Sequence, residues 1–294
     1  MTAEVVADLR EHGVQAILLK GPTTASWLYG RDSLCTYVDT DLLVAPEQWD
    51  AAERCLVRLG FEKVLEDHDT PGYHPPAQEW RQPTGYGMVD LHRSLPGVGV
   101  DESSLWEEVS ETAETTLVGG VEVDALSLAA RALLIALHAA WHGPTTAKPL
   151  EDLTRALDRA DRRVWEEAAA LAQRLDATAG LSAGLRLHPA GERLAEKLGL
   201  PSDLPVGVGL LAGGGPPEAL TLEALAKADG LRSKAWLVFR KVFPSRRFMR
   251  VWFPGAGHSR RRLAIAYLWR PIWLLTKAGP AWRSWRKARV KQAR

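Results

Sequence analysis

The sequence predicts an α+β fold: a small mixed β-sheet flanked by helices, followed by a mostly helical C-terminal part. Two observations predict it. Residues 1–125 alternate short apolar or β-branched runs with segments of helical periodicity, whereas residues 126–294 are rich in Ala and Leu at helical spacing. We therefore divide the chain into a sheet-bearing domain, 1–125, and a helical domain, 126–294. At 294 residues, 46% of them apolar, the chain is long enough for one large domain or two medium ones.

The first domain is expected to begin with a helix and a buried strand. Residues 2–12 carry apolar side chains at helical spacing, with Thr2 placed to cap the helix. The short apolar run 15–19 suits a buried strand. Lys20-Gly21 ends that strand, and Pro22 fits the first position of a helix that runs to about residue 29.

Further strands and one helix complete the first domain. The β-branched run 38–44 predicts a strand, and Pro46 opens a helix to about residue 60. The remaining strands are expected at 61–65, 78–82, 85–92, 114–118 and 121–124. Gly119-Gly120 between the last two is typical of a hairpin turn. The segment 67–76, with its Pro, His and Asp residues, is expected to be a loop, either solvated or overhanging a cleft.

The second domain is predicted to be helical throughout, apart from one break. The stretch 207–217 is rich in Gly and Pro and is expected to be flexible. Helices are expected at 126–142, 149–160, 163–175, 178–187, 218–229, 231–242, 259–278 and 280–291.

A pair of aspartates stands out in the predicted strand V-D-T-D-L-L-V. Side chains two residues apart on a strand share a face, so Asp39 and Asp41 lie side by side. Two carboxylates in apolar surroundings repel each other and destabilise the fold unless a cation is bound. Mg²⁺ takes carboxylate oxygens and keeps positions for phosphate oxygens. We therefore predict that Asp39 and Asp41 bind magnesium.

A third carboxylate, Asp90, occupies a similar setting in the strand 85–92. If this strand lies beside 38–44, Asp90 completes a cluster that could hold two metal ions for in-line displacement at phosphorus. His92 would face the same way as Asp90 and could contact a phosphate or the acceptor.

The Lys20-Gly21 turn is a candidate phosphate site because it ends a strand and opens a helix. The first amides and the positive end of such a helix favour anions. Pro22 lacks an N–H, so Thr23, Thr24 and the Lys20 ammonium would supply the contacts.

The order of strand, Gly turn, helix, D-x-D strand and later single-Asp strand resembles the DNA polymerase beta-type nucleotidyltransferase superfamily. Within it, the phrases I-L-L-K-G-P-T-T-A-S-W-L-Y, D-T-D-L-L-V and V-D-L-H-R-S-L resemble a bacterial group described as nucleotidyltransferase family proteins. The resemblance covers about residues 10–95 and, more loosely, 137–157 and the tail. It implies that Asp39 and Asp41 are the metal-binding pair and Asp90 the third carboxylate.

The resemblance also implies a reaction. It is the Mg²⁺-dependent transfer of a nucleoside monophosphate, AMP from ATP, to a small-molecule, peptide or glycan acceptor. Lys20 and Arg31 are expected to hold the β- and γ-phosphates. The group typically has an arginine four residues before the first aspartate; this chain has Cys35 there, and Arg31 is expected to compensate.

His138 and His142 lie one helical turn apart and so share a face. The family resemblance includes a histidine here and an aspartate that matches Asp152. We expect a hydrogen-bonded contact between the helical part and the cleft; a structural pair or a separate metal site are the alternatives.

The charge distribution sets the tail apart. Residues 231–294 hold 18 Lys/Arg, no Asp or Glu, and six of the 12 tryptophans, leaving 19 basic residues and all 36 acids in 1–230. Such a tail predicts docking on the acidic body or binding of an anionic peptide, nucleic acid or membrane surface. Binding of any of these anionic partners suggests an alternative function, a catalytically weak or inactive protein of the same fold that binds the partner through its basic tail.

Cysteine content and hydropathy suggest a compartment. Two cysteines cannot build a disulfide framework, no apolar run is long enough to span a bilayer, and the first residues lack a secretory signal pattern. We expect a cytoplasmic protein without a transmembrane segment.

Overall fold

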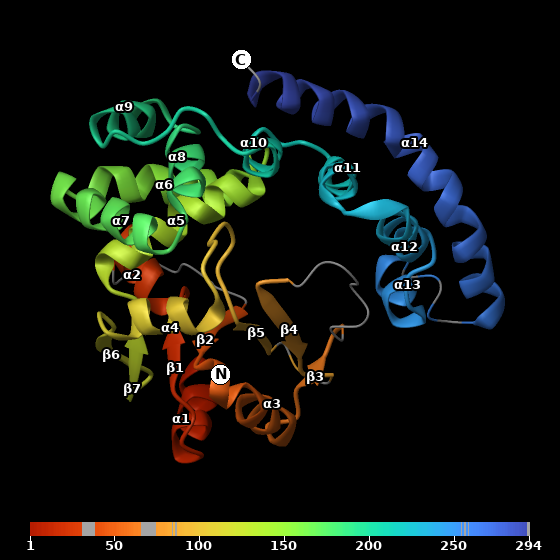
Figure 1. Cartoon of the computed structure of the whole chain (residues 1–294). Helices are drawn as coiled ribbons and strands as arrows, with labels where there is room; N and C mark the ends of the chain where they lie inside the picture. Colours follow the sequence, from red (N-terminus) through yellow and green to blue (C-terminus); the bar gives the residue numbers. More distant parts are fainter. Residues whose placement is uncertain are drawn as a thin grey trace. The chain divides into compact units, whose positions relative to one another are not determined.

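A computed structural model of the chain describes residues 1–30, 39–65, 75–83, 85, 87–253, 255, 257 and 259–292. These form two compact units, one built on Met1–Val64 with Pro76–Leu204 and the other on Pro205–Arg294 (Figure 1). The unit that carries the sheet thus continues to residue 204. The predicted division after residue 125 stays a prediction.

The first unit contains a mixed sheet, as predicted. Among the described residues its strand order is β3-β4-β5-β2-β1-β7-β6. The β1–β7 and β2–β5 pairs are parallel and the other four pairs antiparallel. The strands are β1 (Ala16–Leu18), β2 (Asp39–Val44), β3 (Glu62–Lys63), β4 (Ala77–Arg81), β5 (Met88–His92), β6 (Glu114–Val118) and β7 (Val121–Ala125).

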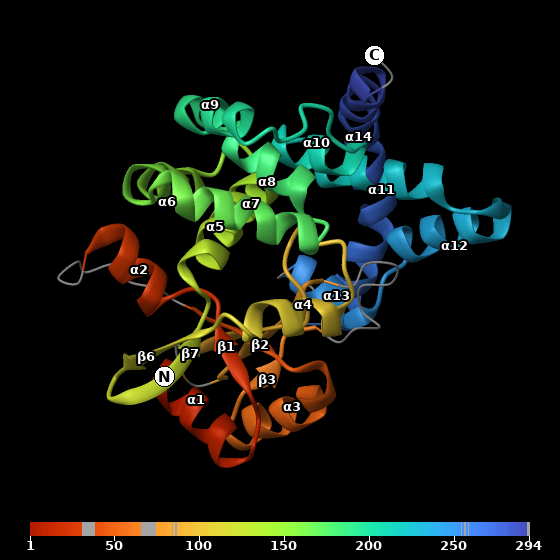
Figure 2. The same cartoon turned by 60° about the vertical axis from the view of Figure 1, so that its left-hand side comes forward.

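Helices cover both faces of this sheet (Figures 1 and 2). Leu18, Leu42 and Leu91 pack on one face against α1 (Thr2–Glu11) and α3 (Trp49–Arg58). Ile17, Leu19 and Leu43 contribute to a second core, made largely by helices from residue 102 onward. Those helices are α4 (Glu102–Ser110), α5 (Leu128–His142), α6 (Ala147–Arg159), α7 (Arg162–Arg174), α8 (Thr178–Leu185) and α9 (Pro189–Lys197). Alternating strand residues therefore build two cores.

Two short helices complete the N-terminal part. The helix α2 (Pro22–Tyr29) follows the Lys20-Gly21 turn with the predicted bounds, and a 3-10 turn, η1 (Pro46–Gln48), precedes α3. Thr2 does not cap α1, which begins after Met1 without a side-chain cap. Its hydroxyl instead hydrogen-bonds the buried Thr40 hydroxyl of β2 at 2.8 Å, because Thr2 faces the sheet.

Several helices were not predicted. Neither α4 nor α9 was expected, although Asp101 and His188 cap them through side-chain bonds to backbone amides. The predicted break at 207–217 is wrong for its first half, where α10 (Val206–Ala212) forms. Val206 and Leu210, one turn apart, are buried there, and this packing outweighs the low helix propensity of glycine.

The second unit is helical. It contains α10, α11 (Pro217–Lys227), α12 (Gly230–Val242), α13 (Arg246–Trp252) and α14 (Arg260–Gln292). The prediction of two helices at 259–278 and 280–291 is wrong, since α14 runs through Pro271 and Pro280 as one bent helix (Figure 1). Each half has its own packing partner: Leu263 lies in a core with α13, and Ala281 in a core with α10 and α11.

No described helix is both long enough and apolar enough to cross a bilayer.

Candidate active site

The three predicted aspartates lie on neighbouring parallel strands. In the β2–β5 pairing, Asp41 stands beside Asp90 and Leu43 beside His92. Asp39 lies two residues before Asp41, so Asp39, Asp41, Asp90 and His92 share one face of the sheet. Adjacent strands are about 4.8 Å apart, which places the Asp41 and Asp90 carboxyl groups next to each other. The predicted pairing of the two strands is confirmed.

Strand β4 adds a fourth acid that the sequence reasoning missed. Glu79 pairs in register with Asp90, and it forms an ion pair with Arg81 on its own strand at 2.6 Å. The alternating pattern of strand 78–82 indicates which face of the strand carries Glu79. It does not indicate that β5, with Asp90, is the neighbouring strand. A row of three acids, Asp41, Asp90 and Glu79, thus crosses three adjacent strands.

Asp41 has the most cationic surroundings of the three aspartates. It is buried, accepts a hydrogen bond from His92 Nε2 at 3.1 Å, and lies 3.8 Å from Lys20 Nζ. Burial alone would raise its pKa, but the His92 hydrogen bond and the Lys20 charge outweigh burial and lower the pKa of Asp41 to about 2. Asp41 is therefore ionised at neutral pH.

Asp90 and Asp39 have the opposite electrostatic environment. Burial, followed by the negative charge of Asp41, raises the pKa of Asp90 to about 6. The same two causes raise the pKa of Asp39. The fold thus holds three carboxyl groups close together, and two of them resist ionisation. A bound divalent cation would offset the repulsion between their negative charges.

His92 is held from both sides. Its Nδ1 lies 3.2 Å from the Ser94 carbonyl oxygen, and its Nε2 lies 3.1 Å from Asp41 Oδ1. These two contacts fix the orientation of the ring. His92, predicted to contact phosphate or acceptor, is thus a direct partner of Asp41.

The Lys20-Gly21 turn lies against the aspartates. The Leu19 amide donates to the Asp41 carbonyl at 3.0 Å, which sets Lys20 beside β2. Gly21 has φ +87° and ψ −129°, a conformation that side-chain-bearing residues rarely adopt. At the start of α2, the buried Thr23 hydroxyl has no hydrogen-bond partner among the described residues. A buried orphan hydroxyl in this place is what a ligand-binding turn would leave unsatisfied.

Helix α5 brings two histidines near this turn. Burial and the charges of Lys20 and His142 hold the pKa of His138 well below its usual value, while Asp41 opposes them. The His138 and His142 rings pack edge to face at 4.4 Å between centroids. The predicted hydrogen bond from this pair to the cleft is not found among the described contacts. His138 is therefore a neutral neighbour of the site at pH 7.

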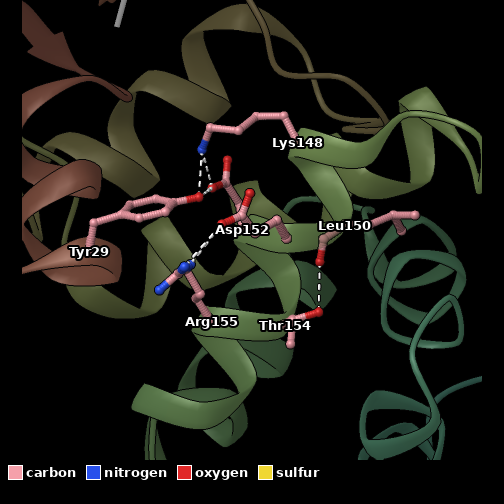
Figure 3. A network of polar contacts seen from close by, with 7 residues as sticks. Tyr29, Lys148, Leu150, Asp152, Thr154 and Arg155 are labelled. Carbon is pink, nitrogen blue, oxygen red and sulfur yellow. Dashed lines mark hydrogen bonds and ion pairs between the residues drawn. The ribbon is translucent and has the colours of Figure 1, made fainter. Parts of the chain in front are cut away.

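A polar network joins α2 to α6 (Figure 3). The Tyr29 hydroxyl donates to Asp152 Oδ1 at 2.5 Å and accepts from Lys148 Nζ at 2.7 Å, and Lys148 forms an ion pair with Asp152. Lys148 and Arg155 also approach the Tyr29 ring, at 4.4 and 4.3 Å from its centroid. The network fixes the C-terminal end of α2, the helix that follows the Lys20-Gly21 turn.

The donor set suits a hard cation, although the three aspartates do not form a tight cage. Carboxylates on rigid strands are the ligands that Mg²⁺ prefers, and Asp39 and Asp90 flank Asp41 from two directions. A tighter group of possible metal ligands lies elsewhere among the described residues. One ligand atom each from Asp8, His12 and Cys55 lies within 4.8 Å of the other two. In that cluster Asp8 is already paired with Arg58 at 2.7 Å.

Some predicted residues lie outside the described part of the chain. Arg31, Cys35 and the loop residues His68, Asp69 and His74 belong to this group, so the predicted phosphate role of Arg31 stays a prediction.

Sequence comparison decides the family. The model of a family described as uncharacterised nucleotidyltransferase matches residues 1–190, which include the three aspartates and the strands of the described part of the chain. The chain belongs to this nucleotidyltransferase family. No curated protein matches it.

Solved structures similar to this family member include nucleotidyltransferases. The solution structure of the antibiotic-resistance factor ANT(2'')-Ia is 15% identical, with a TM-score of 0.43, over 59% of this chain and 90% of that one. ANT(2'')-Ia crystallised with adenylyl-2''-tobramycin is 16% identical, with a TM-score of 0.42, over 58% and 94%. An antigenic nucleotidyltransferase-like protein from Paracoccidioides brasiliensis is 18% identical, with a TM-score of 0.36, over 61% and 89%.

Proposed function

We propose that this nucleotidyltransferase moves AMP from ATP to a hydroxyl group of a small-molecule, peptide or glycan acceptor. The acceptor oxygen forms a bond to the α-phosphorus, the bond from the α-phosphorus to the bridging oxygen breaks, and pyrophosphate leaves. The observation that supports it best is the register of Asp41 with Asp90 on the strand face that also carries Asp39 and faces Lys20. Two cysteines and the need for ATP favour a cytoplasmic reaction.

The proposed metal ligands are Asp39, Asp41 and Asp90. Bound magnesium, in one or two ions, would neutralise phosphate charge and stabilise the pyrophosphate leaving group. Lys20 Nζ, 3.8 Å from Asp41, is placed to reach a phosphate beside those carboxylates. The Thr23 hydroxyl, buried without a partner at the start of α2, would donate to a phosphate oxygen.

Asp90 is the proposed acceptor of the proton from the attacking hydroxyl. It stands in register with Asp41 on the neighbouring strand, so it would lie beside the hydroxyl that a bound metal activates. His92 keeps Asp41 ionised and oriented by a hydrogen bond at 3.1 Å.

The test is release of pyrophosphate and transfer of labelled AMP from ATP with Mg²⁺, across panels of aminoglycosides, peptides and glycans. Asp39→Asn and Asp90→Asn should each reduce transfer at least about a hundredfold, because each removes a proposed metal ligand. Arg58→Gln, at an ion pair on the other face of the sheet, is the matched control and should keep activity. Full activity in either aspartate variant rejects the proposal.

A further inference from the structure

Helix α14 exposes a stripe of large apolar side chains, which we call the α14 stripe. Its members follow helical spacing, so they occupy one side of the helix over about 15 Å. They are Ile265 (59% exposed), Leu268 (75%), Trp269 (48%), Ile272 (51%) and Leu275 (74%).

The opposite side of α14 is already used for packing within the second unit. Leu263 and Ala266 are buried in a core with Met249 of α13. Arg270 is buried on the same side, where it donates to the Lys241 carbonyl at 2.9 Å and stacks over Phe248 and Trp252. The α14 stripe is therefore not the inner face of an amphipathic helix but a second apolar face, and soluble proteins seldom expose one without a partner.

The charges around the stripe indicate what that partner is. Residues 231–294 contain 18 Lys/Arg and no acid. Arg260, Arg261 and Arg262 precede the stripe, and Lys277 follows it, all four exposed. Between them Arg270 is the one charged residue, and it is buried. An apolar centre with basic ends matches an anionic bilayer surface, where apolar side chains enter the interface and Arg and Lys meet the headgroups.

A nucleic acid fits this surface less well. Phosphates laid along the stripe would meet no exposed cation between residues 263 and 276, and of its five side chains only that of Trp269 can stack on a base. A second exposed run lies on α12 and just after it, where Trp236, Phe239 and Phe243 lie in ring contact and are 49–54% exposed. Aromatic rings beside basic side chains are favoured at a membrane interface.

We propose that the second unit docks on an anionic lipid surface through the α14 stripe, with the flanking arginines and lysine at the headgroups. This proposal does not depend on the proposed transfer reaction.

Cosedimentation of the full chain with vesicles tests it. The chain should bind phosphatidylcholine vesicles that contain phosphatidylglycerol and bind pure phosphatidylcholine weakly. Leu268→Gln/Leu275→Gln, which keeps the charge, should weaken binding at least about tenfold, since two leucines no longer enter the interface. Val57→Gln/Leu117→Gln, at positions 61% and 70% exposed in the first unit, is the matched control and should bind as the wild type does.

Each of several results would overturn the proposal. They include no binding to anionic vesicles, equal binding by the stripe variant, equal loss in the matched control, and binding of homopolymer RNA in place of vesicles. A dimer that the stripe variant dissociates, without vesicle binding, would assign the stripe to a second copy of the chain and overturn the proposal as well. Circular dichroism of both variants verifies that the helices remain folded.

Discussion

The carboxyl group of Asp90 should destabilise the metal-free protein at neutral pH. Its pKa is raised to about 6 from an ordinary value of 3.8, first by burial and then by the charge of Asp41. A raised carboxyl pKa means that the folded state binds the proton more tightly than the unfolded state does. Between about pH 4 and pH 6 the unfolded chain loses this proton first, so stability falls as pH rises through that window and stays low above it.

Asp90→Asn removes this effect because the amide resembles the protonated acid. A rise of about 2 in pKa corresponds to about 3 kcal/mol, an upper figure because Asp90 is only partly buried. The variant should therefore be more stable than the wild type by up to about 3 kcal/mol at pH 8 and nearly equal to it at pH 4.

Urea unfolding in the presence of a chelator, followed by circular dichroism at both pH values, measures the difference. Mg²⁺ with ATP should reverse the order at pH 8, because the wild type then gains a ligand that the variant binds less well. If Asp90→Asn is destabilising at pH 8, or if the difference between the two proteins does not change with pH, the electrostatic reasoning is wrong.

Two further substitutions test the supports of the site. Tyr29→Phe removes the hydrogen bond to Asp152 but keeps the ring between Lys148 and Arg155, so we expect a loss of about 1 kcal/mol in thermal unfolding and weaker ATP binding. Thr154→Val, which removes a hydroxyl bonded to the Leu150 carbonyl of the same helix, should leave ATP binding unchanged, and an equal effect of both would refute a role for the network (Figure 3). Gly21→Ala should lower the free energy of unfolding by about 1–3 kcal/mol, because a residue with a side chain is strained at φ +87°. Gly207→Ala, where the added carbon meets open space, should not lower it. Equal melting temperatures of the two variants would contradict the predicted strain.

Local patterns predicted most of the site. The period of two in β2 and β5 placed Asp39 and Asp41 on one face and Asp90 with His92, because alternation along a strand depends on neighbours only. The Lys20-Gly21-Pro22 turn was likewise readable, since a glycine with positive φ and a proline at the first helical position are local requirements. That these two strands lie side by side was an assumption, and the structure shows them paired and parallel.

Contacts between distant segments could not be predicted. Tyr29 and Asp152 are 123 positions apart, and neither segment carries a sequence pattern that predicts their hydrogen bond. Glu79 matters because of which strand lies beside β5, which is a property of the whole sheet. The continuity of α14 through Pro280 depends on packing of Ala281 against α10 and α11, so the local signal for a break was outweighed by tertiary contacts.

The helices that were not predicted differ in whether the sequence carries a local signal for them. Asp101 accepts from the Ser103 and Ser104 amides, a local capping pattern that could have identified α4. The Gly-rich α10 carries no such signal and becomes helical through burial of Val206 and Leu210.

The central claim, that Asp39, Asp41 and Asp90 together bind divalent metal, is tested most directly by a crystal soaked with Mn²⁺ and a non-hydrolysable ATP analogue. Anomalous density should lie between the β2 and β5 carboxylates, with the triphosphate beside Lys20 and the start of α2. Density at Asp8, His12 and Cys55 instead, or an Asp90 carboxylate turned away from a metal held by β2 alone, would contradict it.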